Sequence, residues 1–165
     1  MSDNQLHITG GNTISNAIIS SPFFVNVPYA AGSLASSLTG VGIVNNTVSA
    51  LQVQITTTDT ALEVIGTVTV QNTTINDGVT ISLYRTTLAT LPTAGTTQTG
   101  DTKVWATTTT HGVAAQNVSV GFDFIDTGLL ANTQYGYYVC IVGVTGGTAS
   151  LMGGFNQSTI MLQNI

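Results

Sequence analysis

Apolar and polar residues alternate with a period of two along much of this chain, the pattern of strands that bury one face. The alternation is clearest in LQVQITT and VSVGFDF, where the inward positions are expected to be Leu51, Val53, Ile55, Val118, Val120, Phe122 and Phe124. It predicts eight strands, near residues 23–27, 50–57, 62–71, 79–86, 103–109, 116–125, 134–145 and 158–164. Turn signals such as NDG at Asn76 and TGG at Thr145 separate them.

Strand formers dominate the composition, since Lys, Arg and Glu together total three while Thr, Val and Ile recur throughout. Many short strands with no competing helical period predict an all-β fold, an antiparallel jelly-roll sandwich of about eight strands over residues 23–165. The one long connection, Leu88–Asp101, is expected to be a surface loop or a crossover between sheets. The small-residue stretch Ala30–Gly42 predicts no definite element.

Residues 1–22 are predicted to be an extended N-terminal arm. Strand-like pieces around Leu6–Thr9 and Ile14–Ile19 flank a Gly-Gly pair, and such a segment is suited to adding a strand to a neighbouring subunit. The expected contacts in the arm are Leu6, Ile8, Ile14 and Ile18. The arm lacks the basic region and apolar core of a secretory signal.

The strand at Gln134–Thr145 is apolar on both faces. Strict alternation places Tyr135, Tyr137, Val139 and Ile141 on one face and Tyr138, Cys140, Val142 and Val144 on the other. One face lines the core, and leaving the other in water forfeits about 1.5–3 kcal/mol for each large side chain. We expect a second copy of the protein to cover it, with the chain's own N-terminal segment as the alternative cover.

Charge is scarce, and this narrows the classes of partner. Only 5% of residues are charged, two of them cations (Arg85 and Lys103), with a net charge of −5. Nucleic acid is therefore a poor partner, since phosphate contacts need basic side chains. No apolar stretch reaches membrane-spanning length, and the 42% hydrophobic content argues against disorder.

No catalytic, cofactor or metal constellation stands out, so we expect no enzyme activity and no bound cofactor. His7 and His111 are expected to be solvated polar residues, and the aspartates match no calcium loop. Glu63 is a candidate edge charge or ion-pair partner of Arg85 or Lys103. The single cysteine, Cys140, is expected to pack as a small apolar group. The pattern does not decide whether Trp105 is a core residue or an exposed sugar-binding platform.

The stretches ALQVQITTTDTALEVIGTVTVQNTTINDGVTISLYRTT, QNVSVGFDFIDTGLLANTQYGYYVCIVGV and STIMLQNI resemble small jelly-roll proteins of bacterial spore surfaces. These are the tips of exosporium filament glycoproteins, which are similar to tumour-necrosis-factor-like trimers, and the subunits of endospore appendages. The resemblance spans about Ala50–Ile165 and implies a structural or adhesive role, homo-oligomerisation and no enzyme activity. The appendage arm carries cross-linking cysteines, whereas residues 1–22 contain none.

The leading hypothesis is a self-assembling subunit of an extracellular bacterial filament or spore-surface layer. Its copies would be joined by N-terminal strand addition and sheet-face packing into a trimer or polymer. The alternative is a trimeric tip domain that binds a cell surface or glycan through loops such as Leu88–Asp101. A hydrolase is a remote third reading, tested by replacing His111.

Overall fold

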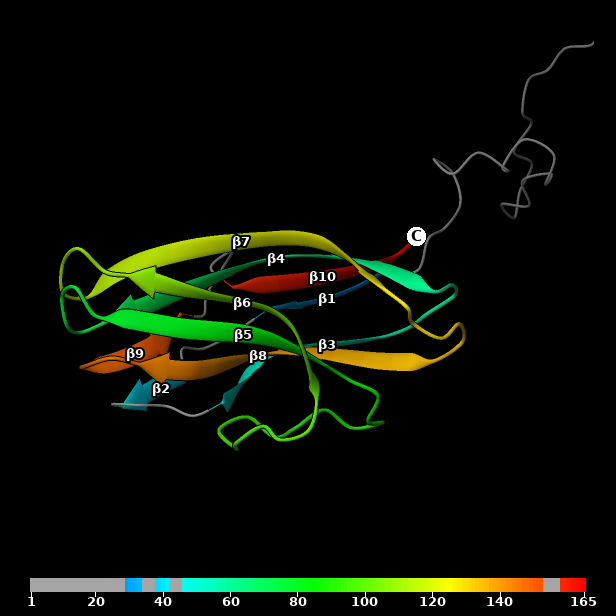
Figure 1. Cartoon of the computed structure of the whole chain (residues 1–165), viewed down its shortest axis with the longest axis horizontal. Helices are drawn as coiled ribbons and strands as arrows, with labels where there is room; N and C mark the ends of the chain where they lie inside the picture. The colour runs from blue at the N-terminus through cyan, green and yellow to red at the C-terminus, as the bar shows by residue number, and fades with distance from the viewer. Residues whose placement is uncertain (1–28, 34–37, 42–45, 153–157) are drawn as a thin grey trace, which may run out of the picture.

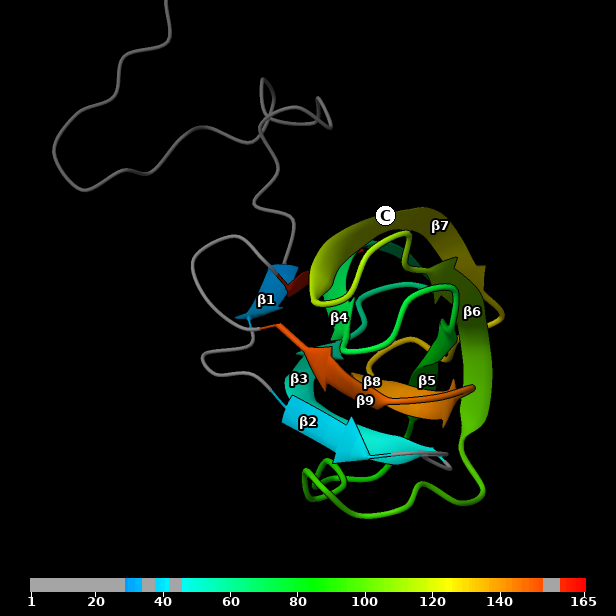
Figure 2. The ribbon, with the colours of Figure 1, turned by 90° about the vertical axis from the view of Figure 1, so that its left-hand side faces the viewer.

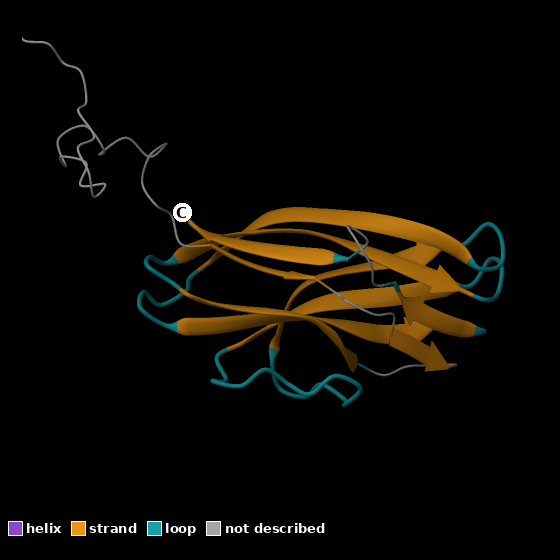
Figure 3. Ribbon diagram, turned by 180° about the vertical axis from the view of Figure 1, so that it is seen from behind, coloured by secondary structure: helices purple, strands orange, loops and turns teal. Residues whose placement is uncertain are grey.

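The computed structural model describes residues 29–33, 38–41, 46–152 and 158–165, which form strands, turns and loops (Figure 3). No helix occurs among these residues, and accordingly none long and apolar enough to cross a membrane. The strands are β1 (Tyr29–Ser33), β2 (Leu38–Val41), β3 (Thr47–Thr56), β4 (Ala61–Asn72), β5 (Gly78–Thr86), β6 (Thr102–Thr110), β7 (Gln116–Thr127), β8 (Gln134–Val144), β9 (Thr148–Leu151) and β10 (Thr159–Asn164).

Two antiparallel sheets pack face to face (Figure 1). In the first, sheet A, the long central strand β4 pairs with β7 along one side, and with β10 and then β9 along the other. β1 continues the sheet beyond β10, and β2 continues it beyond β9. The second, sheet B, has the order β3-β8-β5-β6. The order β1-β10-β4-β7 facing β3-β8-β5-β6 is a jelly roll of eight strands, to which β2 and β9 add a short pair, and it confirms the predicted fold class.

Side chains from the facing sides of both sheets form the main core. Leu51, Val53 and Ile55 of β3 are buried in it, as the alternation predicts. On β7, Phe122 is buried, while Val118, Val120 and Phe124 share its face but are only half-buried. Figure 2 shows the two layers meeting along β6 and β7. There the ring of Trp105 lies 4.9 Å from that of Phe122. Trp105 is therefore a half-buried residue that packs against the core.

Seven of the eight predicted strands lie among the described residues, and all seven are present with ends shifted by up to three residues. The predicted strand at residues 23–27 and the arm at residues 1–22 lie outside them. Three short strands were not predicted: β1, which begins at Tyr29 just before the unassigned stretch Ala30–Gly42, β2, which lies within that stretch, and β9. The long connection joins β5 to β6, which are neighbours in sheet B, so it is not a crossover between sheets.

The strict alternation expected along β8 is interrupted by a bulge. Thr80 pairs with Gly143 and Ile81 pairs with Ile141, so Val142 is the extra residue on β8. Beyond the bulge the side chains change face, and Val144 joins the main core with Tyr137 and Ile141. The prediction that Val144 lies on the second face is therefore wrong.

Candidate functional site

The second face of β8 forms its own small apolar cluster on the outer side of sheet B. Tyr138 and Cys140 from β8, Tyr84 from β5 and Val48 from β3 are its buried members. The rings of Tyr84 and Tyr138 stack with centroids 5.9 Å apart. Leu91 and Val142 pack against these four residues. Leu91 belongs to the connection between β5 and β6, which we call the covering loop (residues 87–101) and which lies below sheet B in Figure 1.

Backbone hydrogen bonds fix the covering loop to the start of β3. The Val48 N–H donates to the Thr96 carbonyl at 2.8 Å, and the Gly95 N–H donates to the Val48 carbonyl at 2.7 Å. The side-chain amide of Gln52 reaches the Pro92 carbonyl at 2.8 Å. The loop is therefore attached both to the edge of β3 and to an outward side chain of that strand.

Tyr138, Cys140 and Val144 were predicted to contact a second copy because they were expected to lie on an apolar face of β8 outside the core. All three are buried at 2% exposure or less within the single chain. Tyr138 and Cys140 lie under the covering loop, and Val144 lies in the main core, because a polar-looking loop brings Leu91 over the sheet. Of the four predicted contacts on β8, Val142 alone is half-buried and reachable. The four predicted contacts in the arm lie outside the described residues.

Both tyrosine hydroxyls under the covering loop are bonded to side-chain partners. The Tyr138 hydroxyl donates to Asp101 Oδ2 at 2.5 Å, and the Tyr84 hydroxyl donates to Asn46 Oδ1 at 2.9 Å. Burial and the bonded carboxylate raise the pKa of Tyr138 well above its usual value. Burial raises the pKa of the Cys140 thiol to about 12. Cys140 therefore stays a protonated apolar group at neutral pH, as the sequence predicts.

The outer side of sheet A has an apolar centre. Ile65 of β4 is opposite Met161 of β10, and both are half-buried. Ile125 of β7 is opposite Glu63, two residues before Ile65 on β4, and is 58% exposed. We call Ile65, Met161 and Ile125 the sheet A patch. Asp123, opposite Ile65, is the other charged residue bordering it.

An ion pair closes one end of the sandwich. Arg85 Nη1 lies 2.6 Å from Asp126 Oδ1, with side-chain exposures of 20% and 10%. The Tyr137 hydroxyl donates to the other carboxylate oxygen at 2.7 Å, and the Arg85 guanidinium lies 5.7 Å from the centroid of the Tyr135 ring. Burial and the bonded carboxylate raise the pKa of Tyr137. Of the alternatives for Glu63, pairing with Arg85 is not found, because Glu63 is on the outer side of sheet A and Arg85 pairs with Asp126.

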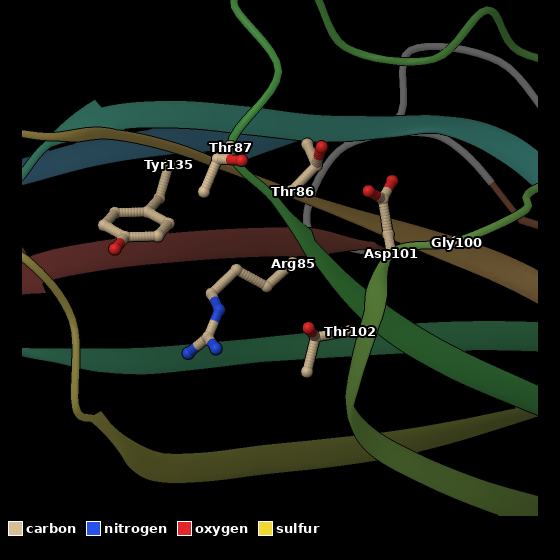
Figure 4. A pocket seen from close by; sticks show the side chains of 7 residues that line it. All are labelled: Arg85, Thr86, Thr87, Gly100, Asp101, Thr102 and Tyr135. Carbon is tan, nitrogen blue, oxygen red and sulfur yellow. The ribbon is translucent and has the colours of Figure 1, made fainter.

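A polar hollow of about 220 Å³ lies beside this ion pair, at the base of the covering loop (Figure 4). It is lined by Arg85, Thr86, Thr87, Gly100, Asp101, Thr102 and Tyr135. In Figure 4 the guanidinium of Arg85 and the carboxylate of Asp101 lie toward different sides of the view, among three threonine side chains. The hollow therefore brings together a cation, an anion and hydroxyl groups.

The other candidates for chemistry are placed apart from this hollow. His111 is fully buried, with Nε2 3.3 Å from the Val70 carbonyl oxygen and no partner on Nδ1, so the expectation of a solvated side chain is wrong. The ring lies against Val70 of β4 and has no exposure to water. No three His, Cys, Asp or Glu side chains group as metal ligands within the described ranges.

Fold and site together define a jelly-roll β-sandwich with a covered outer face on one sheet and an apolar patch on the other. No protein-family model matches the chain, and no curated protein sequence matches it either. Among solved structures it is similar to Eiger TNF from S. frugiperda, with a TM-score of 0.56 and 12% identity over 84% of this chain and 92% of that one. Murine APRIL at pH 5.0 (TM-score 0.47, 8% identity, 84% and 100% coverage) and a chain of infectious bursal disease virus strain Gx (0.41, 13%, 83% and 35%) also match.

The ion pair between Arg85 and Asp126 has a signal in the sequence that was not among the predictions. On β7 the inward alternation runs through Phe122 and Phe124 and continues to Asp126, and on β5 the inward series Ile81, Leu83 continues to Arg85. Opposite charges at inward positions near the ends of two strands indicate a partly buried pair. No comparable signal marks the bulge at Val142 or the position of Leu91.

Proposed function

We propose that this protein is a non-enzymatic, self-associating jelly-roll subunit of an extracellular bacterial surface structure, such as a filament or spore-surface layer. The observation that carries the proposal is the sheet A patch, where Ile65, Met161 and Ile125 come together from three strands on an outer face. The other outer face is covered by the chain's own loop. A second copy of the chain is therefore expected on sheet A rather than on β8.

The extent of sheet A supports an interface larger than the patch. A stable interface buries about 800 Å² on each partner, so the copy must also cover side chains around the patch, including the carboxylates of Glu63 and Asp123 at its border. Thr67 and Thr159 are neighbours on that face and carry no charge. The resemblance to tumour-necrosis-factor-like trimers favours a closed ring over a pair, and strand addition by residues 1–22 would extend such units into a filament.

Strand addition needs an edge with free backbone groups. In sheet B the edge strands are β3 and β6, and the start of β3 is already bonded to the covering loop through Val48. On β6, Lys103 is the only charged residue. Soluble monomers usually protect such edges with charged side chains. β6 is therefore the edge at which we place the incoming arm.

The test is the mass of the full chain in solution, measured by light scattering after size exclusion over a range of concentrations. Ile125→Glu places a charge in the proposed interface and should shift the protein to smaller species. Val113→Glu is the matched control, because Val113 is 59% exposed but lies in the turn between β6 and β7. A monomer at every concentration, or the same mass shift in both variants, contradicts the proposal.

Deletion of residues 1–22 separates the two modes of contact. If the arm links subunits, the deletion should leave small closed oligomers and remove larger species. Electron microscopy of the full chain should then show fibres or sheets. Closed oligomers without fibres from the full chain would favour the tip-domain alternative and count against a filament.

A further inference from the structure

The polar hollow at the base of the covering loop has unused hydrogen-bonding capacity. Asp101, one of the lining residues, accepts the Tyr138 hydroxyl on Oδ2, and its carboxylate can accept further bonds on Oδ1. Arg85 has five N–H donors, of which one bonds Asp126, so donors remain available. The Thr87 and Thr102 side chains are exposed beside them. Donors and acceptors therefore line one small space.

The charges of this space narrow the class of ligand. The positive charge of Arg85 is balanced by Asp126, and Asp101 adds a negative charge. A chain with net charge −5 and a carboxylate in the hollow repels anions such as phosphate. A metal cation would meet the Arg85 guanidinium and too few carboxylates. A neutral ligand with several hydroxyl groups fits, because each hydroxyl both donates and accepts.

We propose that this hollow binds a saccharide residue. A sugar hydroxyl donates to Asp101, neighbouring hydroxyls accept from Arg85, and the threonine hydroxyls complete the network. The volume of about 220 Å³ is below the 300–1,000 Å³ typical of sites for drug-sized ligands, which limits the ligand to about one sugar unit.

The site also depends on how the covering loop is held. Thr87, Gly100 and Asp101 belong to the two ends of this loop, and the Tyr138 hydroxyl fixes Asp101. Gly100 has a φ of +86° with open space where a Cβ would be, so the backbone turns there without blocking the hollow. The fold therefore holds the ligand groups in place before binding, which lowers the entropic cost of association.

The test is a titration of the ¹⁵N-labelled full chain, observed by NMR, with the methyl glycosides of glucose, galactose, mannose and N-acetylglucosamine. At least one sugar should give saturable shifts at the amides of Thr86, Thr87 and Gly100 to Thr102. Thr102→Val removes one hydroxyl and should weaken binding about fivefold. Thr110→Val, an exposed site at the other end of β6, is the matched control and should leave affinity unchanged.

Asp101→Asn is a second variant that keeps an acceptor for the Tyr138 hydroxyl while removing the charge. It should weaken sugar binding by a similar factor and leave the remaining amide spectrum intact. The proposal is overturned if no sugar shifts these amides up to its solubility limit, or if inorganic phosphate shifts them more strongly than any sugar. Equal effects of Thr102→Val and Thr110→Val also overturn it.

Discussion

Replacing Tyr138 by Phe tests whether the covering loop is held by its bond to Asp101. The substitution keeps the stacked ring and the apolar cluster, and it removes only the hydroxyl that donates to Asp101 Oδ2 at 2.5 Å. A hydrogen bond to a charged group contributes about 1.5–3 kcal/mol. Since Asp101 is half-buried and regains water when the bond is lost, the lower end applies, about 1.5 kcal/mol.

Tyr84→Phe is the control, because it removes a hydroxyl in the same cluster whose partner is the neutral amide of Asn46. Its expected cost is about 1 kcal/mol. Chemical unfolding gives both free energies, and hydrogen exchange at the amides of Val48 and Gly95 reports on the loop itself. If the loop opens locally, Tyr138→Phe should speed exchange at these amides about tenfold. Unchanged exchange, with no larger loss of stability than in Tyr84→Phe, would refute the role of Asp101.

Three further predictions concern stability. Tyr137, Tyr138 and Cys140 all have folded pKa values raised above their unfolded values, so each keeps its proton in the folded state at pH values where it is lost on unfolding. Stability should therefore be constant below the unfolded pKa of the thiol and fall above pH 10, by about 1.4 kcal/mol per pH unit for each group and about 4 kcal/mol per pH unit for all of them, measured by urea unfolding; a flat profile to pH 11 would count against it. Gly66→Ala should lower the free energy of unfolding by about 1–3 kcal/mol, because the added Cβ would clash with a backbone carbonyl and an aromatic ring. Gly143→Ala is the control and should leave that free energy unchanged, because its Cβ would contact no other atom. Asp126→Asn should lower the free energy of unfolding, measured by thermal or chemical denaturation, by about 2–3 kcal/mol, because it leaves Arg85 partly buried without an ionic partner.

The fold class could be predicted because the alternation reports burial directly. In β3, Leu51, Val53 and Ile55 are all in the core, and the polar residues between them are not. The same principle fails for short strands, since β9 has four residues and offers too few periods to detect. It also fails at a bulge, where pairing between strands, and not local sequence, decides which face Val144 occupies.

The candidate site was less predictable because it depends on contacts between distant segments. The sequence showed that Tyr138 and Cys140 needed a cover, and that inference was sound. It did not show which segment supplies the cover, because Leu91 is one of two leucines in a loop otherwise composed of small and polar residues, and the other, Leu88, is 55% exposed. Two leucines in such a loop show no strand period, so the one that packs on the sheet can be found only from tertiary structure.

The structure shows how the surface of this chain stays polar with few charged residues. Threonine hydroxyls bond across strands on exposed surfaces, as Thr80 does with Thr108 at 2.8 Å. Such pairs satisfy polar groups without ions and stabilise neighbouring strands by about 0.2–1 kcal/mol. An uncharged face is therefore compatible with water, and scarcity of charge alone does not locate an interface. Sheet A differs because Ile65 and Met161 occupy outer strand positions that threonine could fill equally well. These apolar residues on an outer face are the reason to look for a second copy there.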